Sequence, residues 1–246
     1  MLSILSLNTW QERGPWKERW KMIFTGIKRA KPDIVSFQEV FNADWTGEIK
    51  KETGYSNSAF GPVASGLFVI SKFPIKSQEV LTYSTKSPNE DYLRYCLWTE
   101  MDVYGRPLSL FNTHLSWKVS EGPIRAAQIN ELADFINKKC PKGESAVTGD
   151  FNAPPETEEI KAFIAAGFRD SFEEVNPGSK KITWDNRNPY AAGASHSLPD
   201  RRIDYVFYRH PGSLLKVVQN SRIILNTPNG NGTYASDHYG VLTTFN

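Results

Sequence analysis

Cysteine is scarce in this 246-residue chain. It occurs only at Cys96 and Cys140, which make no disulfide framework and offer no zinc-binding spacing. Long hydrophobic runs are also missing, since no stretch approaches the roughly 20 apolar residues that a membrane span needs. The N-terminal run MLSILSLNTW is shorter than a signal-peptide core, and no basic residues precede it. We therefore expect a cytoplasmic protein without stable membrane insertion; a leader removed from the natural protein stays open as an alternative.

Charge of one sign is not in excess either. Lysine and arginine number 29 against 27 acidic residues, giving a formal net charge of +2. This balanced net charge does not by itself indicate a nucleic-acid partner. A local basic patch that binds nucleic acid is still compatible with it. No internal repeat or low-complexity tract divides the chain. The length suits one domain over residues 1–246 with a sizeable core, and we expect a monomer.

Strand-like and helix-like segments alternate along the chain. Two apolar, β-rich runs, Leu2–Asn8 and Asp33–Val40, flank apolar residues at the helical spacing between Trp16 and Ile27. Further helices are predicted over Pro123–Lys139 and from Glu156 to Ala166. The other predicted strands cover residues 66–75, 95–105, 106–115, 145–152, 202–209, 217–225 and 239–245, with a turn at 105–107 and a long polar loop over 183–201. Hairpins mixed with strands separated by helices predict an α/β sandwich of mixed sheets with helices outside.

Polar side chains stand where these apolar runs end. They are Asn8, Glu39, His114, Asp150 with Asn152, Asp204, and the pair Asp237-His238. Ligand sites of α/β sheets collect at strand ends. Carboxylates and carboxamides suit a hard cation such as Mg²⁺ or Mn²⁺, and histidines can exchange protons with an anionic substrate. The pattern predicts a site that holds a metal ion and binds an anionic substrate.

The stretch SAVTGDFNAPPET shows this pattern most clearly. Because a strand alternates its faces, Asp150 and Asn152 are expected on one side and Phe151 in the core. Two prolines then prevent the strand from continuing. A structural turn is the alternative interpretation of this stretch.

Other residues of the set have structural interpretations as well. Glu39 could pair with a lysine, and His114 could be a hydrogen-bonded core histidine. Asp204 could pair with Arg201 or Arg202. Residue types alone leave these alternatives open.

Six short motifs occur together: SLNTW, SFQEV, NTHL, TGDFN, RIDYVF and SDH. In this order they resemble the endonuclease/exonuclease/phosphatase superfamily, and the resemblance covers Leu2 to Val241. It implies a four-layer sandwich of two mixed β-sheets flanked by helices. By this resemblance Glu39 is the principal metal ligand, with Asn8 and Asp237 helping to place Mg²⁺, for which Mn²⁺ would substitute.

The resemblance also implies catalytic roles. Asp150 would orient and deprotonate the attacking water, and Asn152 would hydrogen-bond the phosphate. His238 would stabilise the charged pentacoordinate state, with Asp204 fixing its tautomer. His114 would be a further phosphate contact.

The implied function is Mg²⁺-dependent hydrolysis of a phosphodiester or phosphomonoester by in-line attack of water. The substrate is expected to be nucleic acid or a small phosphodiester, with Trp117 and His196 as substrate contacts. A sphingomyelinase-like phospholipid phosphodiesterase is one alternative, although the late loop NTPNGNGTYAS is polar where secreted bacterial sphingomyelinases carry an apolar hairpin. An inactive binding module is another, but such a module would normally lose Glu39, Asp150 or His238.

Overall fold

The computed structural model describes residues 1–194, 198–210 and 212–246. Two six-stranded sheets form its centre, here called sheet A (β11-β12-β1-β2-β4-β3) and sheet B (β5-β6-β7-β8-β10-β9). In sheet A, β1 (Leu2–Asn8) pairs in parallel with β2 (Ile34–Gln38) and antiparallel with β12 (Gly240–Phe245). In sheet B, β7 (Arg106–His114) pairs in parallel with β8 (Ser145–Asp150). The predicted pair of mixed sheets is confirmed.

The remaining strands complete the two sheets. They are β3 (Asn57–Phe60), β4 (Phe68–Ser71), β5 (Ile75–Thr82), β6 (Tyr95–Val103), β9 (Arg169–Asp170), β10 (Asp204–Arg209) and β11 (Val218–Ile224).

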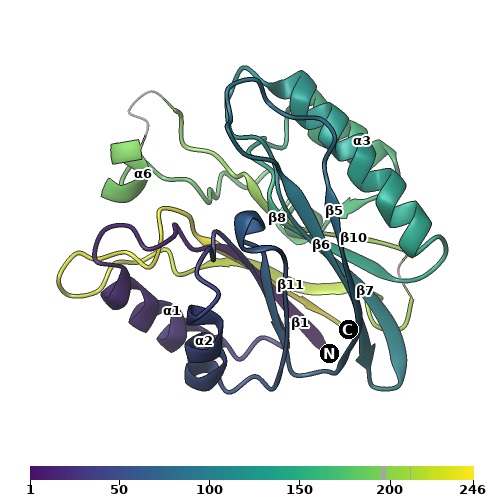
Figure 1. Cartoon of the computed structure of the whole chain (residues 1–246), viewed down its shortest axis with the longest axis horizontal. Coiled ribbons are helices and arrows are strands. Elements are labelled where there is room, and N and C mark those ends of the chain that lie inside the picture. Colours follow the sequence, from purple (N-terminus) through teal and green to yellow (C-terminus); the bar gives the residue numbers. More distant parts are fainter. Residues whose placement is uncertain (195–197, 211) are drawn as a thin grey trace.

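Helices cover the outer faces of both sheets (Figure 1). On sheet A lie α1 (Trp16–Ala30) and α2 (Trp45–Thr53), and on sheet B lie α3 (Gly122–Lys139) and α4 (Glu158–Ala165). The apolar stripe of α1 packs on outward-facing residues of β1 such as Leu5. The short elements are η1 (Val63–Ser65), α5 (Ser171–Val175) and α6 (Pro189–Ala194).

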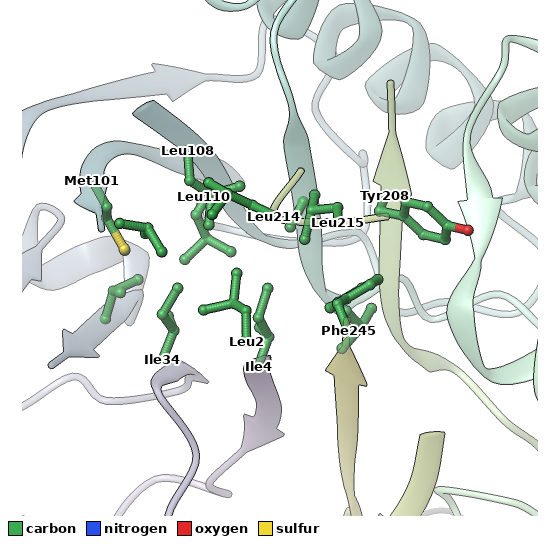
Figure 2. Close-up of a cluster of buried hydrophobic side chains, with 14 of the residues drawn as sticks. Leu2, Ile4, Ile34, Met101, Leu108, Leu110, Tyr208, Leu214, Leu215 and Phe245 are labelled. Carbon is green, nitrogen blue, oxygen red and sulfur yellow. The ribbon is translucent and has the colours of Figure 1, made fainter. Parts of the chain in front are cut away.

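The two sheets meet across an apolar core. Figure 2 shows Leu2, Ile4 and Ile34 of sheet A opposite Met101 and Leu108 of sheet B. In β1, alternate residues point inward to this core and outward to α1, so the strand is buried on both faces. This burial explains why the central strands read as nearly continuous apolar runs.

Strand register brings the polar strand ends together. In sheet B, His114 ends β7, Asp150 ends β8, and Asp204 begins the antiparallel β10; His114 and Asp204 both pair with Asp150. In sheet A, Asn8 ends β1 opposite Gln38 of β2. The carboxyl ends of the parallel strands therefore meet at one end of the sandwich. Polar side chains at this end lie outside the apolar core.

Three local predictions were wrong. The hairpin turn of β6 and β7 lies at Tyr104 and Gly105, because both have the positive φ that a two-residue hairpin turn requires. Helix α6 interrupts the segment that we expected to be a loop throughout. Asn152 is not on the pleat of β8: the strand stops at Asp150, and Asn152 has a left-handed φ of 52°.

Gly149 is a position where only glycine fits. Its φ is 149°, and an added Cβ would lie 2.0 Å from the carbonyl oxygen of Thr113 on the neighbouring strand β7. We expect Gly149→Ala to lower the free energy of unfolding by about 1–3 kcal/mol, measured by urea denaturation. The control is Gly47→Ala inside α2, where nothing lies within 4 Å of an added Cβ; it should stabilise by roughly 0.5–1 kcal/mol. Equal stability of Gly149→Ala and the wild type would contradict this packing.

Candidate active site

A cleft of about 590 Å³ opens at the end of the sandwich where the polar strand ends meet. The predicted residues that line it are Glu39, His114, Trp117, Asp150, Asn152, Asp237 and His238. Asn8 and Asp204 lie directly behind, each hydrogen-bonded to one of the lining residues. The structure therefore brings together every predicted site residue that it describes; His196 lies outside the described residues.

His238 lies between two carboxylates. Its Nδ1 is 2.9 Å from Oδ2 of Asp204, and its Nε2 is 3.6 Å from Oδ2 of Asp150. Burial disfavours the charged imidazole, but the negative charges of Asp204, Asp150 and Asp237 outweigh it and raise the pKa of His238 well above its ordinary value. These charges favour the protonated form of His238, which lines the cleft.

Asp204 is committed to this histidine and not to either neighbouring arginine. Arg202 instead pairs with Asp170, at 2.7 Å. The Asp204 carboxylate is fully buried, so its contact with Nδ1 fixes the ring orientation and leaves Nε2 directed at Asp150.

The pKa of His114 is shifted in the opposite direction to that of His238. Its Nε2 lies 3.3 Å from Oδ2 of Asp150. Burial lowers its pKa, and the positive charges of Arg94 and His238 lower it further. His114 is therefore a neutral imidazole that can donate or accept a hydrogen bond, next to a cationic one.

Asp150 is held by several neighbours at once. Its Oδ1 accepts a hydrogen bond from the backbone N–H of Asn152 at 2.9 Å, and its Oδ2 accepts one from Nδ2 of Asn8 at 3.1 Å. The Asn152 contact is a local Asx turn, which accounts for the left-handed backbone there. Burial raises the pKa of Asp150, against the opposing charge of His238. A buried carboxylate with a raised pKa is suited to accepting a proton.

Glu39 occupies a strained backbone position at the end of β2. Its φ is 64°, a conformation that a non-glycine residue adopts at a cost and that is common at functional sites. The neighbouring N–H of Val40 donates to the carbonyl of Gly66 at 2.9 Å. An added Cβ on Gly66 would lie 3.1 Å from Cα of Glu39, so this glycine allows the two segments to approach.

The carboxylates of Glu39 and Asp237 line the same cleft and are the kind of ligand that a hard divalent cation prefers. Asn8 faces Glu39 through its amide nitrogen, with Nδ2 3.5 Å from Oε1, while its Oδ1 accepts the backbone N–H of Trp10 at 3.0 Å. Burial raises the pKa of Asp237, and the negative charge of Glu39 raises it further. Carboxylates crowded in this way are what a bound divalent cation would neutralise.

A second set of donors is also close together. One ligand atom each from Asp150, Asp204 and His238 lie within 4.8 Å of one another. Here the imidazole already contacts Asp204 through Nδ1 and faces Asp150 through Nε2. Both ring nitrogens of His238 are therefore already directed at carboxylates of this group.

Three arginines of the cleft, Arg13, Arg94 and Arg201, were missed by sequence reasoning. Arg94 makes a bidentate ion pair with Glu90, whose carboxylate also accepts the backbone N–H of Trp117. Arg201, weighed only as a partner of Asp204, lines the cleft as well. A single arginine beside an apolar run carries no periodic signal, so only the tertiary fold shows where its guanidinium points.

Aromatic side chains surround the mouth of the cleft. Trp10 stacks on Tyr190 with 4.6 Å between ring centroids, and Tyr92 and Trp117 are 48% and 38% exposed. Trp184 is buried and meets the His238 ring edge-on at 5.0 Å. Trp16 and Trp45 contact each other beside α1 and do not line the cleft.

The sequence profile of the Endonuclease/Exonuclease/phosphatase family matches residues 6–238. The chain belongs to this family. Its relatives include a phospholipase C of Staphylococcus aureus, 24% identical over 252 residues that span 87% of this chain and 73% of that protein. A 5′-tyrosyl-DNA phosphodiesterase of Caenorhabditis elegans is 24% identical over 235 residues, spanning 92% of this chain and 62% of that protein.

A solved structure of the same family shares the fold. The D. rerio protein TDP2, complexed with a single-stranded DNA product, superposes with a TM-score of 0.82 at 19% identity, over 100% of this chain and 98% of that chain. Family members are metal-dependent phosphodiester hydrolases, so the chain is an enzyme of that class. Among the described residues, no helix combines the length and apolarity needed to cross a bilayer.

Proposed function

We propose that this enzyme hydrolyses phosphodiester bonds of nucleic acid or of small nucleotide esters, with Mg²⁺ as the metal. The observation that carries the proposal is the pair of histidines around Asp150. The buried Asp150 carboxylate lies 3.3 Å from Nε2 of His114 and 3.6 Å from Nε2 of His238, in a cleft lined by arginines and aromatic rings. Such a cleft can bind an anion and activate water beside it.

Asp150 accepts the proton of the attacking water in this mechanism. The hydrogen bonds from Asn8 and Asn152 fix its carboxylate, so the water is positioned before the reaction. A phosphodiester anion repels a nucleophile, so positioning and charge neutralisation supply most of the rate.

The two histidines and Asn152 contact the phosphate. The His238 imidazolium, oriented by Asp204, stabilises the negative charge that builds up on the non-bridging oxygens. His114 and the Asn152 side chain supply neutral hydrogen bonds. Nδ2 of Asn152 is held by the carbonyl of Leu115 at 3.1 Å, which limits its rotation.

Glu39, Asn8 and Asp237 would hold the Mg²⁺ ion, and Mn²⁺ would substitute for it. When bound, the ion supplies Lewis acidity toward the phosphate oxygens. Glu39 and Asp237 line the cleft with carboxylate oxygens. The strained backbone of Glu39 directs its carboxylate into the cleft independently of the substrate.

Nucleic acid fits the lining of the cleft. Arg13 provides positive charge beside the ion-paired Arg94, and Tyr92 and Trp117 present aromatic faces at its mouth. Arginines bind phosphates and aromatic rings stack on bases in proteins that hold single strands. The DNA product in the complex of the relative TDP2 supports the same class of substrate.

A phospholipid phosphodiesterase is the second candidate. Exposed apolar side chains gather near the cleft mouth, with Phe41 at 39%, Val63 at 50% and Trp117 at 38% exposure. The Staphylococcus aureus relative is a phospholipase C. The polar loop of residues 226–236 argues against insertion into a bilayer at that point.

A substrate panel with and without Mg²⁺ tests the proposal. It contains bis-p-nitrophenyl phosphate, a single-stranded oligonucleotide, plasmid and abasic DNA, a phosphomonoester, and sphingomyelin vesicles. We expect Mg²⁺-dependent cleavage of the oligonucleotide and of the chromogenic diester. Cleavage of sphingomyelin alone would favour the lipid candidate, and turnover that survives a chelator would contradict metal dependence.

Trp117 should influence which substrate is preferred. Stacking of a base on an aromatic ring is worth about 1–3 kcal/mol, so Trp117→Ala should raise KM for the oligonucleotide about 5–150-fold. The chromogenic diester should change less than about two-fold. The control is Ile164→Ala on α4, another exposed apolar residue, 42% exposed and outside the cleft. If Trp117→Ala raised KM by the same factor for both substrates, the stacking role would be contradicted.

A further inference from the structure

Arg201 lines the cleft without an ion-paired carboxylate among the described residues. It is 8% exposed, and its Nε is buried without a hydrogen-bond partner among the described residues. Its backbone N–H donates to the carbonyl of Trp184 and its own carbonyl accepts the N–H of Trp184, which fixes its position. The guanidinium lies 5.8 Å from the Trp184 ring centroid.

Other buried arginines nearby have carboxylate partners. Arg94 pairs with Glu90, and Arg202 with Asp170. Arg201 makes no ion pair within the part of the chain that the structure describes. Burial of an unpaired charge is costly, so a buried guanidinium left open to a cleft indicates an anionic ligand that supplies the missing partner.

Arg201 lies near the reaction centre without a direct contact to it: burial lowers the pKa of its guanidinium, and the negative charges of Asp150 and Asp204 partly offset that. Arg201 and His238 both lie next to the ring of Trp184, so the two side chains are neighbours of the same indole. The close polar contacts of the Asp150 side chain come from Asn8, Asn152 and the two catalytic histidines, and Arg201 makes none of them. Its guanidinium is therefore not needed to hold the catalytic carboxylate.

We infer that Arg201 forms a subsite for a second phosphate of the substrate, next to the phosphodiester that is cleaved. This inference rests on the proposed function and narrows its substrate class. A guanidinium binds phosphate through two parallel hydrogen bonds. A nucleic acid offers a phosphate at every nucleotide, whereas the sphingomyelin headgroup offers a quaternary ammonium next to its single phosphate, which Arg201 would repel.

Matched chromogenic esters test the subsite. One pair is thymidine 5′-(p-nitrophenyl phosphate) with and without a 3′-phosphate; the other pair is the 3′-(p-nitrophenyl phosphate) isomer with and without a 5′-phosphate. We expect the wild type to favour the doubly phosphorylated ester of at least one pair by about 10–100-fold in kcat/KM, the range of a charged hydrogen bond. Arg201→Gln should abolish that preference and leave the singly phosphorylated ester within about three-fold.

Two further variants sharpen the test. Arg201→Lys keeps the charge without the planar fork and should retain part of the preference. Arg187→Gln, on an arginine whose side chain is 81% exposed, should retain all of it. Loss of activity on both members of a pair in Arg201→Gln, with an unchanged melting temperature, would place Arg201 at the cleaved phosphate and overturn the subsite. No preference in the wild type would also overturn it.

A binding measurement separates this inference from the proposed function. If the wild type cleaves neither thymidine ester but cleaves sphingomyelin, the proposed function fails. Calorimetry with thymidine 3′,5′-bisphosphate and each thymidine monophosphate then still tests Arg201. Tighter binding of the bisphosphate that disappears in Arg201→Gln supports the subsite; equal binding of all three nucleotides by the wild type contradicts it.

Discussion

Replacement of Asp150 by asparagine is expected to lower the turnover of a phosphodiester by about 10²–10⁴-fold, the usual effect of losing a positioned general base. The amide keeps the shape of the side chain and can still accept the N–H of Asn152. It cannot take a proton from water. Because that interaction is made in the transition state, KM and the affinity for a phosphodiester should stay within a few-fold.

The measurement is steady-state kinetics on the chromogenic diester, with product affinity measured separately. Asp134→Asn, an exposed position on α3, is the matched control and should keep full activity. Near-normal turnover of Asp150→Asn would mean that TGDFNAPP is only a strand-end turn, the structural interpretation that the sequence left open.

Replacement of Glu39 by glutamine should instead change the metal requirement. A chelator is expected to abolish turnover in the wild type, and Mg²⁺ or Mn²⁺ should restore it. Without the Glu39 carboxylate, the Mg²⁺ concentration that gives half-maximal rate should rise by at least about 10–100-fold, since even outer-shell changes have that effect on metal sites. At low Mg²⁺, kcat should fall and KM should rise.

A Mg²⁺ titration of the initial rate measures this shift. Glu48→Gln on the outer helix α2 serves as the control, because it removes the same charge from a residue outside the cleft. An unchanged Mg²⁺ midpoint in Glu39→Gln would show that the cation is held elsewhere, and the Asp150, Asp204 and His238 group would then be the next site to examine.

Residues at strand ends were predictable, whereas the loops that link them were not. The apolar runs of β1, β2 and β8 are buried on both faces and therefore stand out in the sequence, so the polar residues that end them also stand out. The predicted backbone at Asn152 was wrong, because the Asx turn with Asp150 ends β8 two residues before the predicted end of the strand. Such side-chain hydrogen bonds compete with regular structure and leave no periodic trace.

The arginines show a second limit of sequence reasoning. Arg201 and Arg202 are adjacent in the chain, yet one faces the cleft and the other pairs with Asp170. Their different partners depend on where β9 and α5 pack beside β10. Contacts between distant segments decide this, so the residue type at either position carries no information about its role.

Anomalous diffraction from crystals soaked in Mn²⁺ tests the central claim, that Glu39, Asn8 and Asp237 hold the cation and leave Asp150 and His238 free to act on water and phosphate. We predict a strong peak at coordination distance from the Glu39 carboxylate, with the contact between Asp204 and His238 intact. A peak held by Asp150, Asp204 and His238, with Glu39 outside the coordination sphere, would contradict the account.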